Sequence, residues 1–458
     1  MVYNLWESNV LEDNSSDRRN AEFKADVAIL AGGFGSRLKA VIGNNIPKPM
    51  ALFNGIPLLR YQIELCRKYG FTNILILVHH LGSVITEYFD DGSDSGVNIK
   101  YMFEPVPRGT AGALADCSHL LADEFIVIYG DTFLDVDLRD FFNYKLAKSK
   151  LLTFVHPNSH PYDSDLLVLD SDGYVVHVFR PKNSGDTVYN NVVNAGLYVC
   201  NIDIFNNYVP PVGQMDISSE LFPKMIRNGD SIQSYRSVEY IKDMGTPERY
   251  KRVQLDLLNG IPEVLSSRNL RRCVFLDRDG VINKEIGYLS DVSDFVLLDG
   301  VGESIKLLNQ AGFLVICITN QPVIARGELT IPDLEKIHMK MESDLGLEGA
   351  FLDGIYFCPH HPDSGFEGEV KELKKICACR KPEPGMIFNA QREFNIDLKQ
   401  SWFVGDHNRD IQAGINAGTK TILLSDEIQA GVRSDESFST LFQAVEHILN
   451  TAGVDSDR

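Results

Sequence analysis

The chain has 458 residues, more than one ordinary domain holds, so we expect two or three domains with separate cores. Its 44 basic and 63 acidic residues give a formal net charge of −19, which disfavours nonspecific binding to nucleic acid or to an anionic membrane, although local basic sites for small anions remain compatible with it. The sequence has neither a signal-like start nor an apolar stretch of about 18 residues, and we therefore expect a soluble, cytoplasmic protein.

Short apolar runs alternate with longer amphipathic stretches in two groups along the chain, a pattern typical of α/β folds with parallel sheets. The groups are separated by a polar stretch with Gly, Pro and Ser, which predicts a connector. We predict a polar tail at 1–24, a first domain at 25–258, a linker at 259–270 and a second domain at 271–452.

A glycine-rich segment, LAGGFGSRL at 30–38, follows the first apolar run. It lacks the Gly-Lys-Ser/Thr of a Walker loop and the third glycine and acidic residue of a dinucleotide-binding fingerprint. Backbone N–H groups at glycines can approach an anion, while Arg37 and Lys48 can neutralise phosphate charge. The segment predicts a phosphate-binding loop, with a plain strand–turn–helix as the alternative; its glycines are Gly32, Gly33 and Gly35.

Two aspartates further along the first half are candidates for a metal site. Asp131 directly follows an apolar run, which places it at the carboxyl edge of a parallel sheet, where ligands of such folds bind. Asp243 lies in the segment DMGTPERY. Two such carboxylates can hold Mg²⁺ against nucleotide phosphates, whereas either one alone can also be a cap or a turn residue.

Six segments resemble the sugar-1-phosphate nucleotidylyltransferases, in the same order, across residues 25 to 255: LAGGFGSRL, PKP, EPVPRGTAGAL, YGD, NAGLYV and DMGTPERY. The resemblance implies a Rossmann-like domain with a mixed, mostly parallel sheet. It also implies an in-line attack of a sugar 1-phosphate on the α-phosphorus of a nucleoside triphosphate, without a covalent intermediate.

The same resemblance assigns roles to individual residues. Arg37 and Lys48 would contact the nucleoside triphosphate, and Asp131 and Asp243 would bind the metal. The residues near the sugar phosphate would be Glu104, Gly112, Lys182 and Asn194. Lys182 follows Arg-Pro, where the family usually carries an acidic residue before Lys-Pro.

The second half opens with another pair of carboxylates. In VFLDRDGVIN, Asp277 and Asp279 stand just beyond an apolar run and are two residues apart. Such a pair suits a nucleophile and an acid/base, with Mg²⁺ offsetting their repulsion. A glycine-capped Asx turn is the structural alternative.

Three later segments complete a pattern that resembles the haloacid dehalogenase-type phosphatases: ICITNQ, CRKPEPGM and FVGDHNRD. By this resemblance Asp277 attacks phosphorus, and Asp279 protonates the leaving oxygen and then activates water. Mg²⁺ would be bound by Asp277, the backbone of Asp279, and Asp406, and Asp410 is either a supporting residue or an exposed helix residue. The residues of the phosphoryl and substrate site would be Thr319, Asn320, Arg380 and Lys381.

A group of cysteines and histidines comes before Arg380 and Lys381 in the sequence. The segments CPHH and CAC supply Cys-x-His and Cys-x-Cys pairs, which suit a closed tetrahedral zinc site. The predicted ligands are Cys358, His360, Cys377 and Cys379, with His361 as the alternative to His360. Since Arg380 and Lys381 follow Cys379 directly, zinc would brace their loop and have a structural role.

The zinc pairs, TNQPVIARG and CRKPEPGM together resemble the heptose-bisphosphate and histidinol-phosphate phosphatase branch. Removal of the 7-phosphate from heptose 1,7-bisphosphate yields a heptose 1-phosphate, which is an acceptor for a nucleotidylyltransferase. The combination resembles bifunctional D-glycero-D-manno-heptose enzymes with a guanylyltransferase, which implies GTP and these two heptose phosphates as substrates, and a role in lipopolysaccharide or other surface-glycan synthesis. The alternatives are another sugar 1-phosphate, histidinol phosphate, one inactive regulatory half, or a non-enzymatic scaffold.

Overall fold

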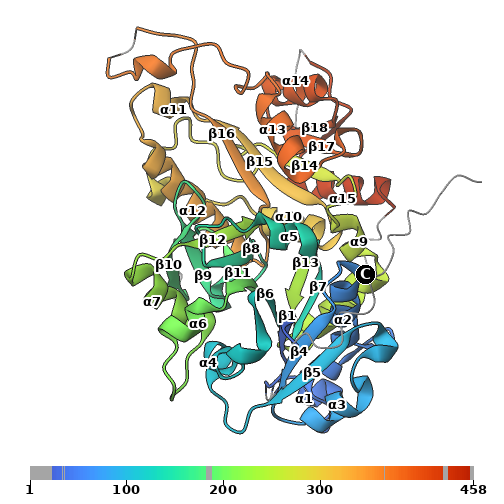
Figure 1. Cartoon of the computed structure of the whole chain (residues 1–458). Helices are drawn as coiled ribbons and strands as arrows, with labels where there is room; N and C mark the ends of the chain where they lie inside the picture. The colour runs from blue at the N-terminus through green and yellow to red at the C-terminus, as the bar shows by residue number, and fades with distance from the viewer. Residues whose placement is uncertain are drawn as a thin grey trace, which may run out of the picture.

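Two α/β domains make up the protein, as a computed structural model of the chain shows (Figure 1). The structure describes residues 23–33, 35, 37–181, 188–365, 367–425 and 432–453. The predicted polar tail, except for its last two residues, and the predicted sugar-phosphate residue Lys182 lie outside this part of the chain. Among the described residues, no helix is both long and apolar enough to cross a membrane.

A mixed sheet forms the first domain. Its central strand β1 (Ala25–Leu30) lies parallel to β4 (Asn73–Val78) on one side and to β6 (Leu121–Tyr129) on the other. Beyond β4 lies β5 (Asn98–Phe103), also parallel, and beyond β6 lies β11 (Val193–Asn201), which is antiparallel. The remaining strands of the sheet are β8 (Leu151–His156), β9 (Leu166–Leu169), β10 (Val175–Phe179) and β12 (Ile232–Arg236).

Helices cover both faces of this sheet, which explains its nearly continuous apolar strands. Along β1, Val27 and Ile29 belong to one core cluster with α2 and α3, whereas Ala28 belongs to another with α4 and α6. The helices are α1 (Lys39–Ile42), α2 (Leu58–Lys68), α3 (Gly82–Phe89), α4 (Gly109–Asp116), α5 (Leu138–Tyr144), α6 (Asp203–Tyr208), α7 (Phe222–Arg227) and α8 (Pro247–Leu258).

Six parallel strands form the sheet of the second domain, in the order β16-β15-β14-β17-β18-β19. Their bounds are β14 (Cys273–Leu276), β15 (Leu314–Asn320), β16 (Gly354–Cys358), β17 (Trp402–Gly405), β18 (Lys420–Leu424) and β19 (Glu436–Phe438). The strand order reverses direction between β14 and β17, and ligands of open α/β sheets bind at such a reversal. Asp277 and Asp406 directly follow these two strands.

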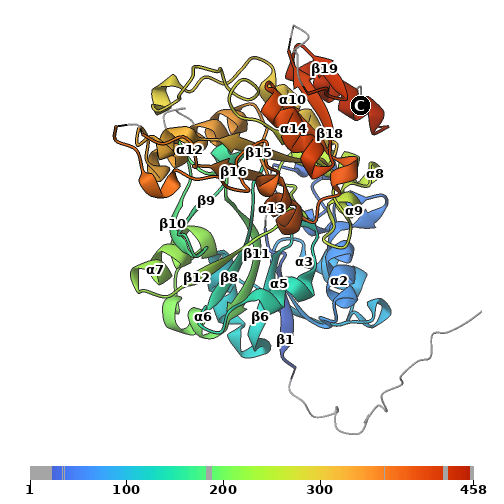
Figure 2. The same ribbon diagram turned by 90° about the horizontal axis from the view of Figure 1, so that it is seen from above.

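The helices of the second domain pack on its sheet around a core that includes Leu276, Val315 and Val404. They are α10 (Val301–Gln310), α11 (Pro322–Ala325), α12 (Ile331–Leu347), α13 (Gly385–Phe394), α14 (Asn408–Ala417) and α15 (Leu441–Thr451). Figure 2 shows α12 on the side of this domain that faces β9 and β10 of the first.

The stretch interpreted as a linker contains a helix, α9 (Ile261–Leu265). Ile261 is buried, and Leu265 packs against core clusters of both domains. Gly312 of the second domain packs closely against Ile261, so that a Cβ there would lie 3.2 Å from its Cδ1. The segment between the domains is therefore packed at their interface, because its apolar residues Ile261 and Leu265 lie on the buried face of α9.

Candidate active sites

A cavity of about 290 Å³ lies at the carboxyl ends of the first domain's parallel strands. The glycine loop after β1 forms its middle, Asp131 after β6 lies toward one end, and Glu104 after β5 toward the other. The predicted site residues that line this cavity are Gly32, Gly33, Lys48, Glu104 and Asp131. A single sheet edge thus gathers residues that are up to 99 positions apart, from 32 to 131.

Cations and carboxylates alternate at the Asp131 end of the cavity. Lys48 Nζ lies 2.9 Å from Asp131 Oδ2. Asp243 ends β13 (Tyr240–Asp243) and stands opposite Thr132, the first residue of β7 (Thr132–Asp135). The Met244 N–H also donates to the Asp131 carbonyl at 3.0 Å, which fixes the two predicted metal-binding aspartates as neighbours.

The side chains of Arg37 and Asp243 both lie close to Gly245. A Cβ at Gly245 would lie 3.0 Å from Asp243 Oδ1 and 3.3 Å from Arg37 Nη2. Gly35 of the predicted phosphate loop has a φ of +61°, and a Cβ there would lie 2.8 Å from Lys48 Cγ. The structure therefore brings Arg37, Lys48, Asp131 and Asp243 into one neighbourhood, in which Lys48 and Asp131 line the cavity and Arg37 and Asp243 do not.

Two predicted residues lie behind the cavity wall. Asn194 donates to the Tyr198 hydroxyl at 2.8 Å and accepts from Thr153 at 3.0 Å, and Tyr198 in turn contacts Tyr129, which lines the cavity. Gly112 lies within α4, where a Cβ would meet the Arg108 Cβ at 2.7 Å. In this structure both residues support the wall and do not line the cavity.

Sequence reasoning missed a third carboxylate of the cavity, Asp216. Its Oδ1 accepts from the Thr110 backbone N–H at 3.0 Å, and both residues line the cavity. Asp216 precedes a π-helical turn and follows no apolar strand, so the strand-end signal that marked Asp131 is missing there. Only the fold of the chain brings this residue to the site.

The second site is built around a buried lysine. Lys381 Nζ lies 2.7 Å from Asp277 Oδ1 and 2.8 Å from Asp410 Oδ1, and it donates to the Ile318 carbonyl at 2.8 Å. Burial and the neighbouring Asp410 raise the pKa of Asp277 to about 7. Although burial opposes the lysine charge, the two carboxylates hold the pKa of Lys381 above its usual value.

Asp410 is fully buried, which rules out its interpretation as an exposed helix residue. Its Oδ2 accepts the His407 backbone N–H at 3.1 Å, which caps α14, while its Oδ1 meets the lysine. A Cβ on Gly405 would collide with the Asp410 side chain, so the glycine that ends β17 makes room for this carboxylate.

Asp279 is held by three polar side chains that the sequence did not identify. The Arg278 guanidinium donates to both of its oxygens at 2.9 Å, Gln321 donates at 2.9 Å and Asn283 at 3.0 Å. Although burial raises the pKa of Asp279, these partners, Arg278 first, lower it below the usual value. Arg278 is itself fully buried, and nothing in the local sequence pattern marks it as inward-facing.

The other predicted residues of this site surround the same strand ends. Asp406 contacts the turn at Gly280, which has a φ of +83° and leaves no space for a Cβ. Thr319 accepts from Gln321 at 2.8 Å. The Asn320 side chain exchanges two hydrogen bonds, of 3.0 and 3.1 Å, with the backbone of Lys381.

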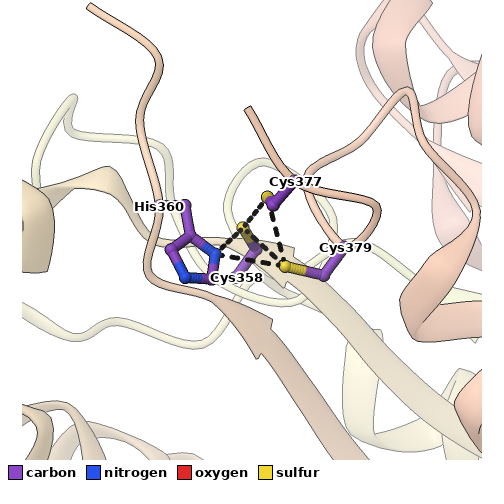
Figure 3. A group of neighbouring side chains, drawn as sticks. All are labelled: Cys358, His360, Cys377 and Cys379. Atoms are coloured by element: carbon purple, nitrogen blue, oxygen red, sulfur yellow. Dashed lines mark hydrogen bonds between the residues drawn. The ribbon is translucent and has the colours of Figure 1, made fainter. Parts of the chain in front are cut away.

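Four side chains from two loops converge beside this site (Figure 3). The distances among His360 Nδ1 and the sulfurs of Cys358, Cys377 and Cys379 that define the cluster are 3.3 to 3.6 Å. Ligand atoms about 2.0–2.3 Å from a tetrahedral ion lie about 3.3–3.8 Å apart, so the cluster fits a metal ion. The cluster contains His360 and not His361, whose Nδ1 accepts the Asp363 N–H at 3.1 Å.

The cysteine cluster is joined directly to the lysine site. Arg380 donates through Nη1 to the carbonyl of His360 at 3.1 Å, and Lys381 follows it. Gly385 packs so tightly against the Ala378 carbonyl that a Cβ would collide with it. The loop that presents Lys381 to Asp277 is therefore anchored by the same residues that form the cluster.

Replacement of Lys381 by Met is expected to lower the free energy of unfolding by about 3–5 kcal/mol in magnesium-free buffer, because two buried carboxylates lose their cation. Denaturant unfolding of Lys381→Met and of the control Lys420→Met, whose side chain is exposed on β18, measures this effect. Equal unfolding midpoints for the two variants would show that the buried ion pairs do not stabilise the site.

Comparisons with known proteins match the two domains separately. The family model described as Nucleotidyl transferase matches residues 27–260, just over half of the chain. The model described as HAD-hydrolase-like matches residues 378–440. Among solved structures, HddC from Yersinia pseudotuberculosis is 26% identical with a TM-score of 0.44, over 51% of this chain and 99% of that chain.

Curated relatives match a third of the chain. The D-glycero-beta-D-manno-heptose-1,7-bisphosphate 7-phosphatase of Yersinia pestis is 44% identical over 152 residues, 33% of this chain and 79% of that protein. The D-glycero-alpha-D-manno-heptose-1,7-bisphosphate 7-phosphatase of Burkholderia mallei is 45% identical over 153 residues, again 33% of this chain and 79% of that protein. The chain thus combines a transferase domain and a phosphatase domain, and it belongs to the nucleotidyl transferase family and, through its second domain, to the heptose-1,7-bisphosphate 7-phosphatase family.

Proposed function

We propose that the protein removes the 7-phosphate from D-glycero-D-manno-heptose 1,7-bisphosphate and then transfers GMP from GTP to the resulting heptose 1-phosphate, giving GDP-heptose and pyrophosphate. The observation that carries this proposal is the presence of two assembled sites on one chain, the Asp131 cavity and the Lys381 cluster. The product expected from the second site is an acceptor for the first. Both substrates are soluble metabolites that a cytoplasmic enzyme would meet.

In the proposed phosphatase reaction, Asp277 attacks the 7-phosphorus and the bond from phosphorus to the sugar oxygen breaks. Asp279 gives its proton to that oxygen, and the same carboxylate then takes a proton from water, which attacks the phosphoaspartate and releases phosphate. Lys381, 2.7 Å from Asp277, offsets the phosphoryl charge. Substrate binding would have to move Arg278 from Asp279, because that guanidinium stabilises the deprotonated form.

In the proposed transferase reaction, an oxygen of the heptose 1-phosphate attacks the α-phosphorus of GTP and pyrophosphate leaves from the opposite side. The glycine loop admits the triphosphate close to its backbone N–H groups. We assign Arg37 and Lys48 to the departing pyrophosphate, where charge builds up and preorganised cations stabilise the transition state. The chain needs only to position the two phosphates in line.

We assign Mg²⁺ to both sites, because each supplies two carboxylates, and such pairs suit a cation that also binds phosphate. Asp131 and Asp243 would hold it in the first domain, and Asp277, Asp406 and the backbone of Asp279 in the second. When bound, Mg²⁺ neutralises phosphate oxygens and polarises phosphorus toward attack. We also assign Zn²⁺ to the cysteine cluster, because three thiolates and one imidazole at tetrahedral spacing are a preferred zinc set.

Loss of the cysteine cluster is expected to reduce phosphatase activity and to spare the transferase. Cys379→Ser would weaken zinc binding and loosen the loop that presents Lys381. The kcat for phosphate release should therefore fall at least about 10-fold, a loss comparable to that caused by mutating residues that support metal ligands. Metal analysis and phosphate release measure the two effects, and Cys200→Ser, in the first domain's core, is the control. A full zinc content in the Cys379 variant would contradict the ligand assignment.

The resemblance implies GTP as the donor and puts Glu104 near the sugar phosphate, but the chemistry of the cavity end opposite Asp131 supports a different role for Glu104, in binding the base. Glu104 lies against Gly32 there, and a Cβ on this glycine would sit 2.7 Å from its Oε2. A carboxylate offers two acceptors, which match the adjacent N1–H and N2–H donors of guanine, and a matched bidentate pair discriminates bases by about 1–3 kcal/mol. We therefore place the base near Glu104, and the sugar phosphate beyond Asp131 on the β11 side.

Glu104→Gln is expected to reduce kcat/KM for GTP about 10- to 100-fold, because the amide replaces one acceptor by a donor. The activities with GTP, ATP and UTP, compared by pyrophosphate release, measure the change in preference. Asp216→Asn is the matched control, since it alters another carboxylate of the same cavity. An unchanged preference for GTP in the Glu104 variant would exclude Glu104 from base selection.

Pyrophosphate release from heptose 1-phosphate tests the transferase half directly. We expect release with GTP and Mg²⁺ that requires the heptose 1-phosphate. Release that is greater with a hexose 1-phosphate, or no release with any nucleoside triphosphate, would reject this half of the proposal.

A further inference from the structure

Helix α12 of the phosphatase domain packs against the transferase domain (Figure 1 and Figure 2). The Ser343 hydroxyl accepts the Tyr189 backbone N–H at 2.9 Å, and both residues are buried. One turn further along the helix, Gly346 packs on Pro161, and a Cβ at this glycine would lie 2.5 Å from the proline Cγ. The helix thus holds two segments of the first domain, 189–191 and η5 (Pro161–Asp163).

A pair of buried asparagines ties these two segments together. The Asn158 N–H donates to Asn191 Oδ1 at 3.1 Å, and Asn191 Nδ2 donates to the Asn158 carbonyl at 2.7 Å. The Asn158 side chain then accepts the His160 N–H at 3.0 Å. Asn158 and Asn191 are 9% and 2% exposed, so any shift of one segment must move the other or break buried hydrogen bonds.

The η5 turn ends at Asp163, which is linked through Arg249 to Asp243, the carboxylate that we assign to the transferase metal. Arg249 donates through Nη2 to Asp163 Oδ2 at 2.6 Å and to His160 Nδ1 at 3.0 Å. Its Nη1 donates to Asp243 Oδ1 at 2.9 Å. A single guanidinium therefore links the η5 turn to Asp243, and its planar, fixed geometry transmits the position of one to the other.

We infer that α12 of the phosphatase domain is a positioning element of the transferase site, acting on Asp243 through Pro161–Asp163 and Arg249. This inference rests on the proposed function, because it takes Asp243 as a metal ligand of the transfer reaction. Ser343 and Gly346 are then positioning residues, and neither belongs to the phosphatase site described above. Metal and phosphate must be held to about 0.5 Å for efficient chemistry, and a misplacement of about 1 Å can cost about 100-fold in rate.

Two variants of α12 test the inference in the full-length protein. Ser343→Ala removes the bond to Tyr189, and we expect it to raise the Mg²⁺ concentration for half-maximal pyrophosphate release several-fold. Gly346→Leu pushes on Pro161, and we expect kcat for pyrophosphate release to fall at least about 10-fold at saturating GTP. Phosphate release from heptose 1,7-bisphosphate should stay at the wild-type rate in both, which also shows that the second domain is folded.

Ser304→Ala is the matched control. Ser304, in α10, is also buried and, like Ser343, donates to the carbonyl four residues earlier, here that of Gly300. Within the described part of the chain it makes no bond to the first domain. Wild-type Mg²⁺ dependence in Ser343→Ala together with a wild-type kcat in Gly346→Leu would overturn the inference, as would equal effects of Ser343→Ala and Ser304→Ala.

Calorimetric titration of GTP with and without Mg²⁺ separates this inference from the proposed function. If the wild-type protein binds GTP in a Mg²⁺-dependent way but releases no pyrophosphate, the proposed reaction fails, and the inference is judged by whether the α12 variants weaken that binding. Absence of Mg²⁺-dependent GTP binding in the wild-type protein overturns both.

Discussion

Asp277→Asn is expected to lower the release of phosphate from heptose 1,7-bisphosphate at least about 1,000-fold, because an amide cannot form the proposed acyl-phosphate bond. The size of the substitution is small, and Lys381 keeps its second partner, Asp410, so the domain should remain folded. Phosphate release and unfolding by denaturant, measured on the same preparation, separate lost chemistry from lost structure.

The same variant should keep its transferase activity when heptose 1-phosphate is supplied, since Asp277 lies in the other domain. Asp299→Asn, an exposed aspartate of the second domain, provides the control and should leave both activities unchanged. Phosphate release by Asp277→Asn at a wild-type rate would refute the nucleophile assignment.

Asp131→Asn is expected to lower pyrophosphate release at least about 100-fold, because the amide neutralises one of the two carboxylates assigned to Mg²⁺ and removes the partner of Lys48. Phosphate release from the bisphosphate should continue at the wild-type rate. Asp123→Asn, at the opposite end of the same strand β6, is the matched control. A transferase rate in Asp131→Asn equal to that of this control would remove Asp131 from the site.

The strand-end rule explains why much of both sites could be predicted from the sequence. Asp277 and Asp406 directly follow a buried apolar strand and Asp131 lies two residues beyond one, and parallel strands bring such residues to one edge. The cysteine pairs were equally informative, because their spacing restricts a tetrahedral set to a few residues. Neither signal depends on contacts between distant helices.

What the sequence could not supply depends on tertiary packing. Asp410 was left between a supporting and an exposed role, since a helix position alone does not show whether its face is covered. Arg278 was not singled out from the sequence, yet it is fully buried against Asp279. The contacts of α12 with the first domain join residues more than 150 positions apart, and the apolar periodicity of a helix does not identify its partner.

The central claim is that the two sites act in sequence on one sugar. The most direct measurement gives the protein heptose 1,7-bisphosphate with GTP and Mg²⁺ and follows phosphate and pyrophosphate in the same reaction. We predict that phosphate appears first, that pyrophosphate follows after a lag, and that Asp277→Asn produces neither until heptose 1-phosphate is added. Pyrophosphate that forms without prior phosphate release, or phosphate that is never followed by pyrophosphate with any nucleoside triphosphate, would contradict the account.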